Sequence, residues 1–115
     1  MPKYVFCVFT DAVEGREDEY NHWYTNTHLA DVVAVPGFVA AQRFKLEPSQ
    51  DTPFQQRYLA IYEVETDDLQ ATKKALTHAA KSGAMPVSDA LAPDVIAAYY
   101  QQITERVTAA APISA

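Results

Sequence analysis

Apolar and polar positions alternate along four stretches of the chain and recur at helical spacing along two others. Alternating β-branched and aromatic residues are typical of strands, and apolar residues three and four positions apart are typical of an amphipathic helix. We therefore predict strands at 3–10, 38–46, 58–64 and 95–103, and helices at 16–26 and 66–83. A further helical turn is expected at 29–35, because the Pro36-Gly37 pair that follows ends a helix.

The order of these elements, β-α-β-β-α-β, matches the ferredoxin-like plan of an α+β fold with a four-stranded antiparallel sheet. The 115 residues have the length of one domain, which we place at 1–107. Residues 47–56 contain two prolines and are expected to form an exposed loop. Residues 108–115 are expected to form a flexible tail.

The predicted strands carry apolar side chains on both faces of the sheet. The first strand, for example, places Phe6 on one face and Cys7 and Phe9 on the other. Two helices of this length cover only one face, so the second would leave a large apolar patch on a monomer. We therefore predict a homodimer in which two sheets meet face to face and form an α+β barrel.

Composition narrows the possible partners. The net charge of -6 and the lack of clustered basic residues argue against nucleic acid and against anionic membranes. No apolar run approaches the about 18 residues of a membrane-spanning helix. The first residues lack the features of an export signal, and the single cysteine, Cys7, suits a reducing compartment. We expect a cytoplasmic protein.

The residue types that bind metals and cofactors are poorly arranged for that purpose. His22 and His28 are six residues apart, about 120° around an ideal helix, and do not share a face. The three glycines are isolated, so no phosphate-binding loop is indicated. The serines lack the sequence context of a nucleophile elbow. We expect neither a metal nor a cofactor.

One stripe of the first helix remains as a candidate site. Asn21, Tyr24 and His28 are spaced to present polar groups on one otherwise apolar face. Asp31 follows at i+3 from His28 and could accept a hydrogen bond from Nδ1, which would leave Nε2 free as a base. The alternative is structural, with His28 closing the helix end and Asp31 capping the next turn. The many tyrosines of so small a domain require hydrogen-bond partners or line a cavity.

The segment "EDEYNHWYTNTHLADVVAVPGFVAAQRF" resembles the EthD-like family of the dimeric α+β barrel superfamily. The resemblance consists of a Trp-Tyr pair, a His-Leu-Pro-Asp motif and a Val-Pro-Gly-Phe motif. The matching residues here are Trp23, Tyr24, His28, Leu29, Asp31, Val35, Pro36, Gly37 and Phe38. Ala30 replaces the usual proline, so the helix is expected to run through His28 with less of a kink.

The resemblance implies a homodimer with a pocket between the sheet and the helices. Relatives in the superfamily include cofactor-independent enzymes of aromatic and xenobiotic catabolism. Our hypothesis is therefore a cofactor-independent isomerase, cyclase or lyase acting on a hydrophobic, aromatic or polyketide-like molecule. His28 would be the general acid or base, Asp31 its orienting partner, and Tyr24 the donor to a developing oxyanion. The substrate-binding residues would be Asn21, Trp23, Phe6, Tyr62 and Tyr99.

Two other hypotheses remain open on the sequence. The first is a non-catalytic small-molecule-binding protein or an accessory protein of an oxygenase, which would use the same pocket without proton transfer. The second is a purely structural contact between the helix and the sheet, with no pocket under His28.

Overall fold

The computed structural model describes residues 1–48 and 56–110. Its elements follow the predicted order. They are β1 (Lys3–Thr10), α1 (Glu17–Trp23), the π-helix η1 (Tyr24–His28), α2 (Leu29–Val33), β2 (Phe38–Lys45), β3 (Tyr58–Glu65), α3 (Leu69–Lys81) and β4 (Ile96–Gln101). Most of the loop predicted at 47–56, and residues 111–115 of the predicted tail, lie outside the described residues.

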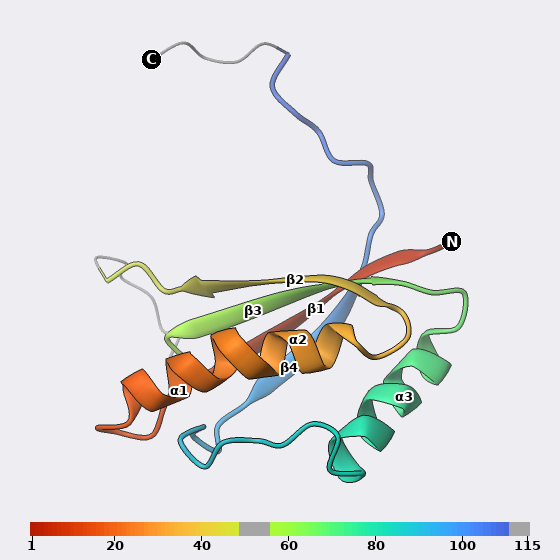
Figure 1. Cartoon of the computed structure of the whole chain (residues 1–115). Coiled ribbons are helices and arrows are strands. Elements are labelled where there is room, and N and C mark those ends of the chain that lie inside the picture. Colours follow the sequence, from red (N-terminus) through yellow and green to blue (C-terminus); the bar gives the residue numbers. More distant parts are fainter. Residues whose placement is uncertain (49–55, 111–115) are drawn as a thin grey trace.

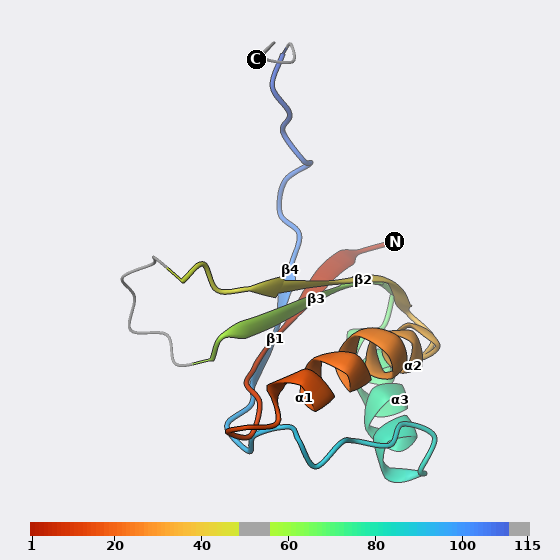
Figure 2. The same ribbon diagram turned by 60° about the vertical axis from the view of Figure 1, so that its left-hand side comes forward.

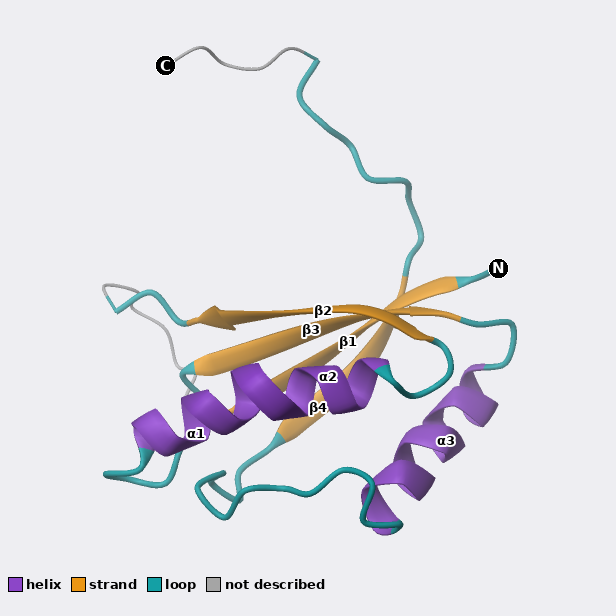
Figure 3. Cartoon of the chain, in the orientation of Figure 1, coloured by secondary structure: helices purple, strands orange, loops and turns teal. Residues whose placement is uncertain are grey.

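The strands form one antiparallel sheet in the order β2-β3-β1-β4, which confirms the predicted ferredoxin-like α+β fold. All helices lie on the same side of this sheet (Figures 1 and 3). The helical region from α1 to α2 connects β1 to β2, and α3 connects β3 to β4. One face of the sheet is therefore covered by helices, and we call the opposite face the open face.

The first helical region is continuous from Glu17 to Val33, which joins the helices predicted separately at 16–26 and 29–35 and agrees with the expectation that the helix runs through His28. Three acidic residues in its first turn suit the helix dipole. In the middle, η1 widens the turn, and the backbone N–H of Leu29 bonds to the carbonyl of Tyr24 five residues earlier. Alanine at position 30 retains an N–H that proline would lack, so the helix can continue to α2.

The helix α3 begins at Leu69, three residues after the start predicted at 66. The Asp68 carboxylate accepts a hydrogen bond from the backbone N–H of Ala71 at 3.1 Å and so caps the helix. Thr72, in the first turn, is buried against Gly37, the residue that leads into β2. This contact joins the second helical region to the end of the first.

The core under the helices is rich in tyrosine. Its fully buried side chains include Tyr20, Tyr24 and Tyr62, with Val64 beside them. Phe6 on β1 packs on Tyr62 and stacks on Tyr99 of β4 at 4.1 Å between ring centroids. An aromatic layer therefore runs across the sheet from α1 to β4.

The open face is apolar, as the strand pattern predicted. The strand register places three cross-strand rows on it, in which only Gln42 and Glu63 are polar or charged, and the charged pair Lys3 and Glu65 lies on the same face beyond the third row. The rows are Phe44, Leu59, Phe9 and Ile96; Gln42, Ile61, Cys7 and Ala98; and Ala40, Glu63, Val5 and Tyr100. At its edges Phe44, Ile96 and Tyr100 are exposed.

Candidate functional site

His28 ends the π-helical turn, and its imidazole is held by two aromatic rings. The ring stacks on Trp23, with centroids 4.6 Å apart and planes 29° apart. It meets Tyr24 edge to face at 4.8 Å. The side chain is only partly buried, so these two contacts position the imidazole without enclosing it.

The predicted hydrogen bond between His28 and Asp31 is wrong. Nδ1 of His28 is buried and has no hydrogen-bond partner among the described residues. Burial lowers the pKa of His28 from its ordinary value of 6.5, and the charge of Asp31 opposes this shift to a smaller extent. Asp31 therefore acts on His28 through its electric field. The imidazole is neutral at pH 7, and a buried polar nitrogen of this kind requires an explanation.

A neutral imidazole carries one N–H and one lone pair, which have different costs when buried without a partner. Because orphaned N–H groups are rarer in proteins than orphaned acceptors, we infer that the proton resides on Nε2 and the lone pair on Nδ1. In this tautomer the lone pair of Nδ1 has no hydrogen-bond donor among the described residues, and the ring that carries it stacks on Trp23.

Tyr24 does not present a free hydroxyl to a ligand, in contrast to the role expected from the sequence. Its hydroxyl lies 3.0 Å from the hydroxyl of Tyr62, and both side chains are buried. Burial raises the pKa of Tyr24 to about 12 and also raises the pKa of Tyr62. Both phenols are therefore neutral and satisfy each other, so Tyr24 contributes its ring to the position of His28.

Asn21 is likewise occupied by protein partners. Its amide nitrogen donates to the hydroxyl of Tyr58 at 3.2 Å, and its amide oxygen accepts from Arg43 at 2.9 Å. The stripe of Asn21, Tyr24 and His28 is thus divided, because the wider π turn changes the angular spacing after Tyr24. Asn21 contacts β2 and β3, and His28 contacts Trp23 and Tyr24.

Arg43 is a central residue that the sequence reasoning missed. Its guanidinium lies over the rings of Tyr20, Tyr24 and Tyr58, at 5.2, 4.6 and 5.3 Å from their centroids. It also donates to Thr25 Oγ1 at 2.8 Å. Arg43 faces the helices because a β-bulge between Phe38 and Ala40 shifts the alternation of β2. Counting in steps of two from buried Phe38 would place it on the open face.

A second polar cluster ties the start of α1 to the sheet. Arg57 Nε donates to Asp11 at 2.9 Å, and Arg57 Nη1 donates to Glu17 at 3.2 Å. The hydroxyl of Tyr58 also donates to Glu17, and this bond lowers the pKa of the carboxyl. Each of these groups is paired within the cluster, whereas Nδ1 of His28 has no partner among the described residues, so we take His28 as the candidate reactive group.

The remaining predicted binding residues lie on the helix side of the sheet. Phe6 and Tyr99, which stay partly exposed, form the stacked pair described above, and Lys73 of α3 places its ammonium 5.1 Å from the Tyr99 ring centroid. Trp23 donates its indole N–H to the carbonyl of Pro86 at 3.2 Å. The structure therefore brings Phe6, Tyr62 and Tyr99 together, and places Trp23 with His28.

Residues 3–111, which include all of the side chains described above, match one family model, a domain of unknown function (DUF4286). The chain belongs to the DUF4286 family. The family description carries no activity, and no curated protein matches the chain in sequence.

Solved structures resemble this DUF4286 domain over most of its length. A heme-degrading protein, MhuD from Mycobacterium tuberculosis, with two hemes in its active site, has 19% identity, a TM-score of 0.61 and coverage of 90% of this chain and 99% of that one. An EthD-like protein from Ralstonia eutropha JMP134 has 14% identity, a TM-score of 0.60 and coverage of 92% and 96%. A variant of SnoaB from Streptomyces nogalater, a cofactor-independent oxygenase, has 16% identity, a TM-score of 0.52 and coverage of 89% and 94%.

At these identities the likeness establishes the fold of the DUF4286 domain. The EthD-like resemblance is supported only at the level of the ferredoxin-like fold, because EthD-like proteins are one of several groups among the structural neighbours. Over the described residues no helix has the length and apolar character needed to cross a membrane. Nor do three or more potential metal-binding side chains gather anywhere in 1–48 or 56–110.

Proposed function

We propose that this protein is a small cofactor-independent enzyme that transfers a proton on a hydrophobic, aromatic or polyketide-like molecule. The observation that carries the proposal is His28, a neutral and partly exposed imidazole whose Nδ1 has no partner among the described residues. Isomerase, cyclase and lyase reactions can each begin when a positioned general base of this kind takes a proton from carbon. We assign that role to His28.

The aromatic surroundings support a flat, apolar ligand. Tyr20, Tyr24 and Tyr62 are fully buried, whereas Phe6 and Tyr99 on the same side of the sheet stay partly exposed. A ligand can stack on these partly exposed rings with little loss of conformational entropy, because their neighbours already hold the rings in place. The name of one structural neighbour agrees with such a ligand, since that protein holds hemes in its active site.

The proposed step uses the lone pair of His28 Nδ1. Half a turn of the ring about Cβ–Cγ exchanges Nδ1 with Cδ2 and retains the contacts with Trp23 and Tyr24. Nδ1 then accepts a proton from a carbon beside a carbonyl of the ligand, and the C–H electron pair moves into an enolate. The field of Asp31 favours the imidazolium that forms.

The proposal predicts exchange of carbon-bound hydrogen in heavy water. Enolisable aromatic ketones and polyketide fragments that raise the melting temperature would be incubated with the protein in D2O, and deuterium in the ligand measured by mass spectrometry. Because burial lowers the pKa of His28, the neutral base persists below pH 6.5. The exchange rate should therefore be level above pH 6.5 and fall only at lower pH. Ligands that bind without acquiring deuterium would instead support the non-catalytic binding or accessory role.

That second role is favoured by one observation. Tyr24 and Asn21, the other polar groups of the predicted stripe, are both used by protein partners. A ligand would then meet aromatic rings and a single imidazole, which suffices for binding. Deuterium incorporation separates the two functions directly, because only the enzyme breaks a C–H bond.

We further propose that the protein acts as a homodimer through its open face. Apart from Gln42, Glu63 and the pair of Lys3 and Glu65 at its end, this face presents apolar side chains from all four strands, which would be an unusually large exposed patch on a monomer. A cytoplasmic location is expected, since the single cysteine, Cys7, is a free thiol on this face.

Replacement of Ile61 by aspartate should convert the dimer to a monomer. Ile61 lies in the middle row of the open face between Gln42 and Cys7, so the new charge would be buried without a partner in the dimer. Sedimentation velocity at micromolar concentration would measure the change. Thr77→Asp, on the exposed side of α3, is the matched control and should remain dimeric. A monomeric wild-type protein would contradict the proposal.

A further inference from the structure

Residues 102–110 form an extended arm that leaves the end of β4 and makes no buried contact with the rest of the described chain. The last ladder bond before it joins the N–H of Gln102 to the carbonyl of Lys3 at 2.8 Å. Beyond that point every described residue is exposed, including Ile103 at 92% and Val107 at 91%. Figures 1 and 2 show the arm rising from the side of the sheet opposite the helices. It therefore projects into the space above the open face.

The composition of the arm is that of a strand. Its sequence, QITERVTAA, contains four β-branched residues and no glycine, proline, asparagine or aspartate. Such a segment lacks the residues that reverse the chain direction, so folding back over its own open face is disfavoured. Ile103 and Val107, four positions apart, share one side of an extended chain. Glu105 lies between them on the same side. The apolar side chains of Ile103 and Val107 are exposed, and no described residue of their own domain covers them.

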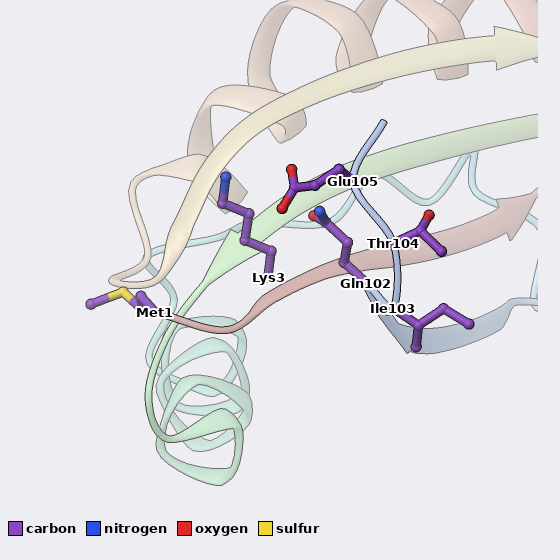
Figure 4. A pocket seen from close by; sticks show the side chains of 6 residues that line it. All are labelled: Met1, Lys3, Gln102, Ile103, Thr104 and Glu105. Atoms are coloured by element: carbon purple, nitrogen blue, oxygen red, sulfur yellow. The ribbon is translucent and has the colours of Figure 1, made fainter. Parts of the chain in front are cut away.

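Two openings at the base of the arm are also left unfilled. One, of about 440 Å³, lies between the arm and the end of the open face and is lined by Val5, Tyr100 and Arg106 among others. The other, of about 400 Å³, lies between the arm and the N-terminus. Figure 4 shows Ile103 directed away from Met1 and Lys3 at this opening. The arm leaves space beside it on both sides, as expected where a second chain fits.

We propose that the arm of each protomer docks on a second copy of the same chain. This inference rests on the dimer proposed above and adds the element that holds it together. The open face and the arm are continuous in space, and among the described residues both expose large apolar side chains, those of Phe44, Ile96 and Tyr100 on the face and of Ile103 and Val107 on the arm. A second sheet packed on the open face would lie about 10 Å away. Residues 102–110, extended at about 3.3 Å per residue, are long enough to pass beside that sheet. In a twofold dimer each arm clasps the other protomer, so the contact is made twice.

Hydrogen–deuterium exchange on the full-length protein tests the docked arm. Amides of residues 103–108 should be protected in the wild-type dimer and exchange at the rate of an unstructured peptide in the Ile61→Asp monomer. An arm that exchanges without protection in a protein shown to be dimeric would overturn the docked arm and leave the dimer standing. A protein that is monomeric throughout would overturn both.

Paired substitutions test which side of the arm makes the contact. I103D/V107D should weaken dimerisation by at least about tenfold, because two apolar side chains on each arm lose their contact. T104D/T108D adds the same charge to the opposite side of the arm and should change the dissociation constant by less than about threefold. Equal effects of the two pairs, or no effect of the first, would overturn the proposal. Neither pair touches the His28 site, so deuterium incorporation into a ligand reports on the enzyme independently.

Discussion

Replacement of His28 by phenylalanine is expected to slow ligand deuteration by about 10²–10⁴-fold, the usual contribution of a general base. Phenylalanine retains a ring that can stack on Trp23 and meet Tyr24, and it removes the Nδ1 that has no partner among the described residues. The free energy of unfolding should therefore change by only about 1 kcal/mol or less. Ligand deuteration, followed by mass spectrometry beside a chemical denaturation curve, separates the lost chemistry from any loss of folding.

His78→Phe is the matched control for this experiment. His78 lies on the exposed side of α3, so the same substitution there should leave both exchange and stability unchanged. Exchange that survives His28→Phe at the wild-type rate would remove His28 from the mechanism. Loss of stability by several kcal/mol in His28→Phe would instead indicate a structural role for the imidazole.

Replacement of Gly37 by alanine is expected to destabilise the fold by about 3 kcal/mol. Gly37 has φ of +99°, a conformation that costs other residues about 1–2 kcal/mol. A Cβ at this position would also lie 2.8 Å from Thr72 Oγ1 and 2.9 Å from Thr72 Cγ2. Because Thr72 is buried, it cannot move aside freely, and overpacking adds about 1–3 kcal/mol. Thermal unfolding should show a fall in melting temperature of roughly 10–20 °C.

Gly15→Ala distinguishes the two contributions. Gly15 has φ of +81°, and no atom lies within 4 Å of the Cβ that alanine would add. This variant should lose only the conformational part, about 1–2 kcal/mol. Equal losses in the two variants would show that the contact with Thr72 contributes nothing, and that Gly37 is needed only for its backbone conformation.

The fold was largely predictable because it depends on local patterns. The bounds of β1 agree with the sequence prediction, and α3 begins at Leu69, three residues after its predicted start. The apolar character of both sheet faces could also be read from strand alternation, since side chains on a strand alternate strictly. The bounds of these elements and the alternation of their side chains depend on residues that are close in sequence, so they can be read from the sequence.

The candidate site was predicted only in part. Trp23, Tyr24 and His28 were expected to lie together, and the structure places their rings in contact. The hydrogen bond from His28 to Asp31 was wrong, and the hydroxyl of Tyr24 pairs with that of Tyr62 on the sheet. A helical wheel of 3.6 residues per turn misplaces side chains after a π turn, which has a different angular spacing.

The sequence by itself therefore determined the elements, their order, the apolar open face and the aromatic surroundings of His28. Only the tertiary structure decided which polar groups remain unpaired. Arg43 joins three tyrosine rings because one β-bulge reverses the alternation of β2. Nδ1 of His28 has no partner among the described residues because π-helical backbone geometry and long-range packing determine its surroundings together. Hydrogen-bond partners distant in sequence depend on register and on turn geometry, and both are set by the assembled sheet and helices.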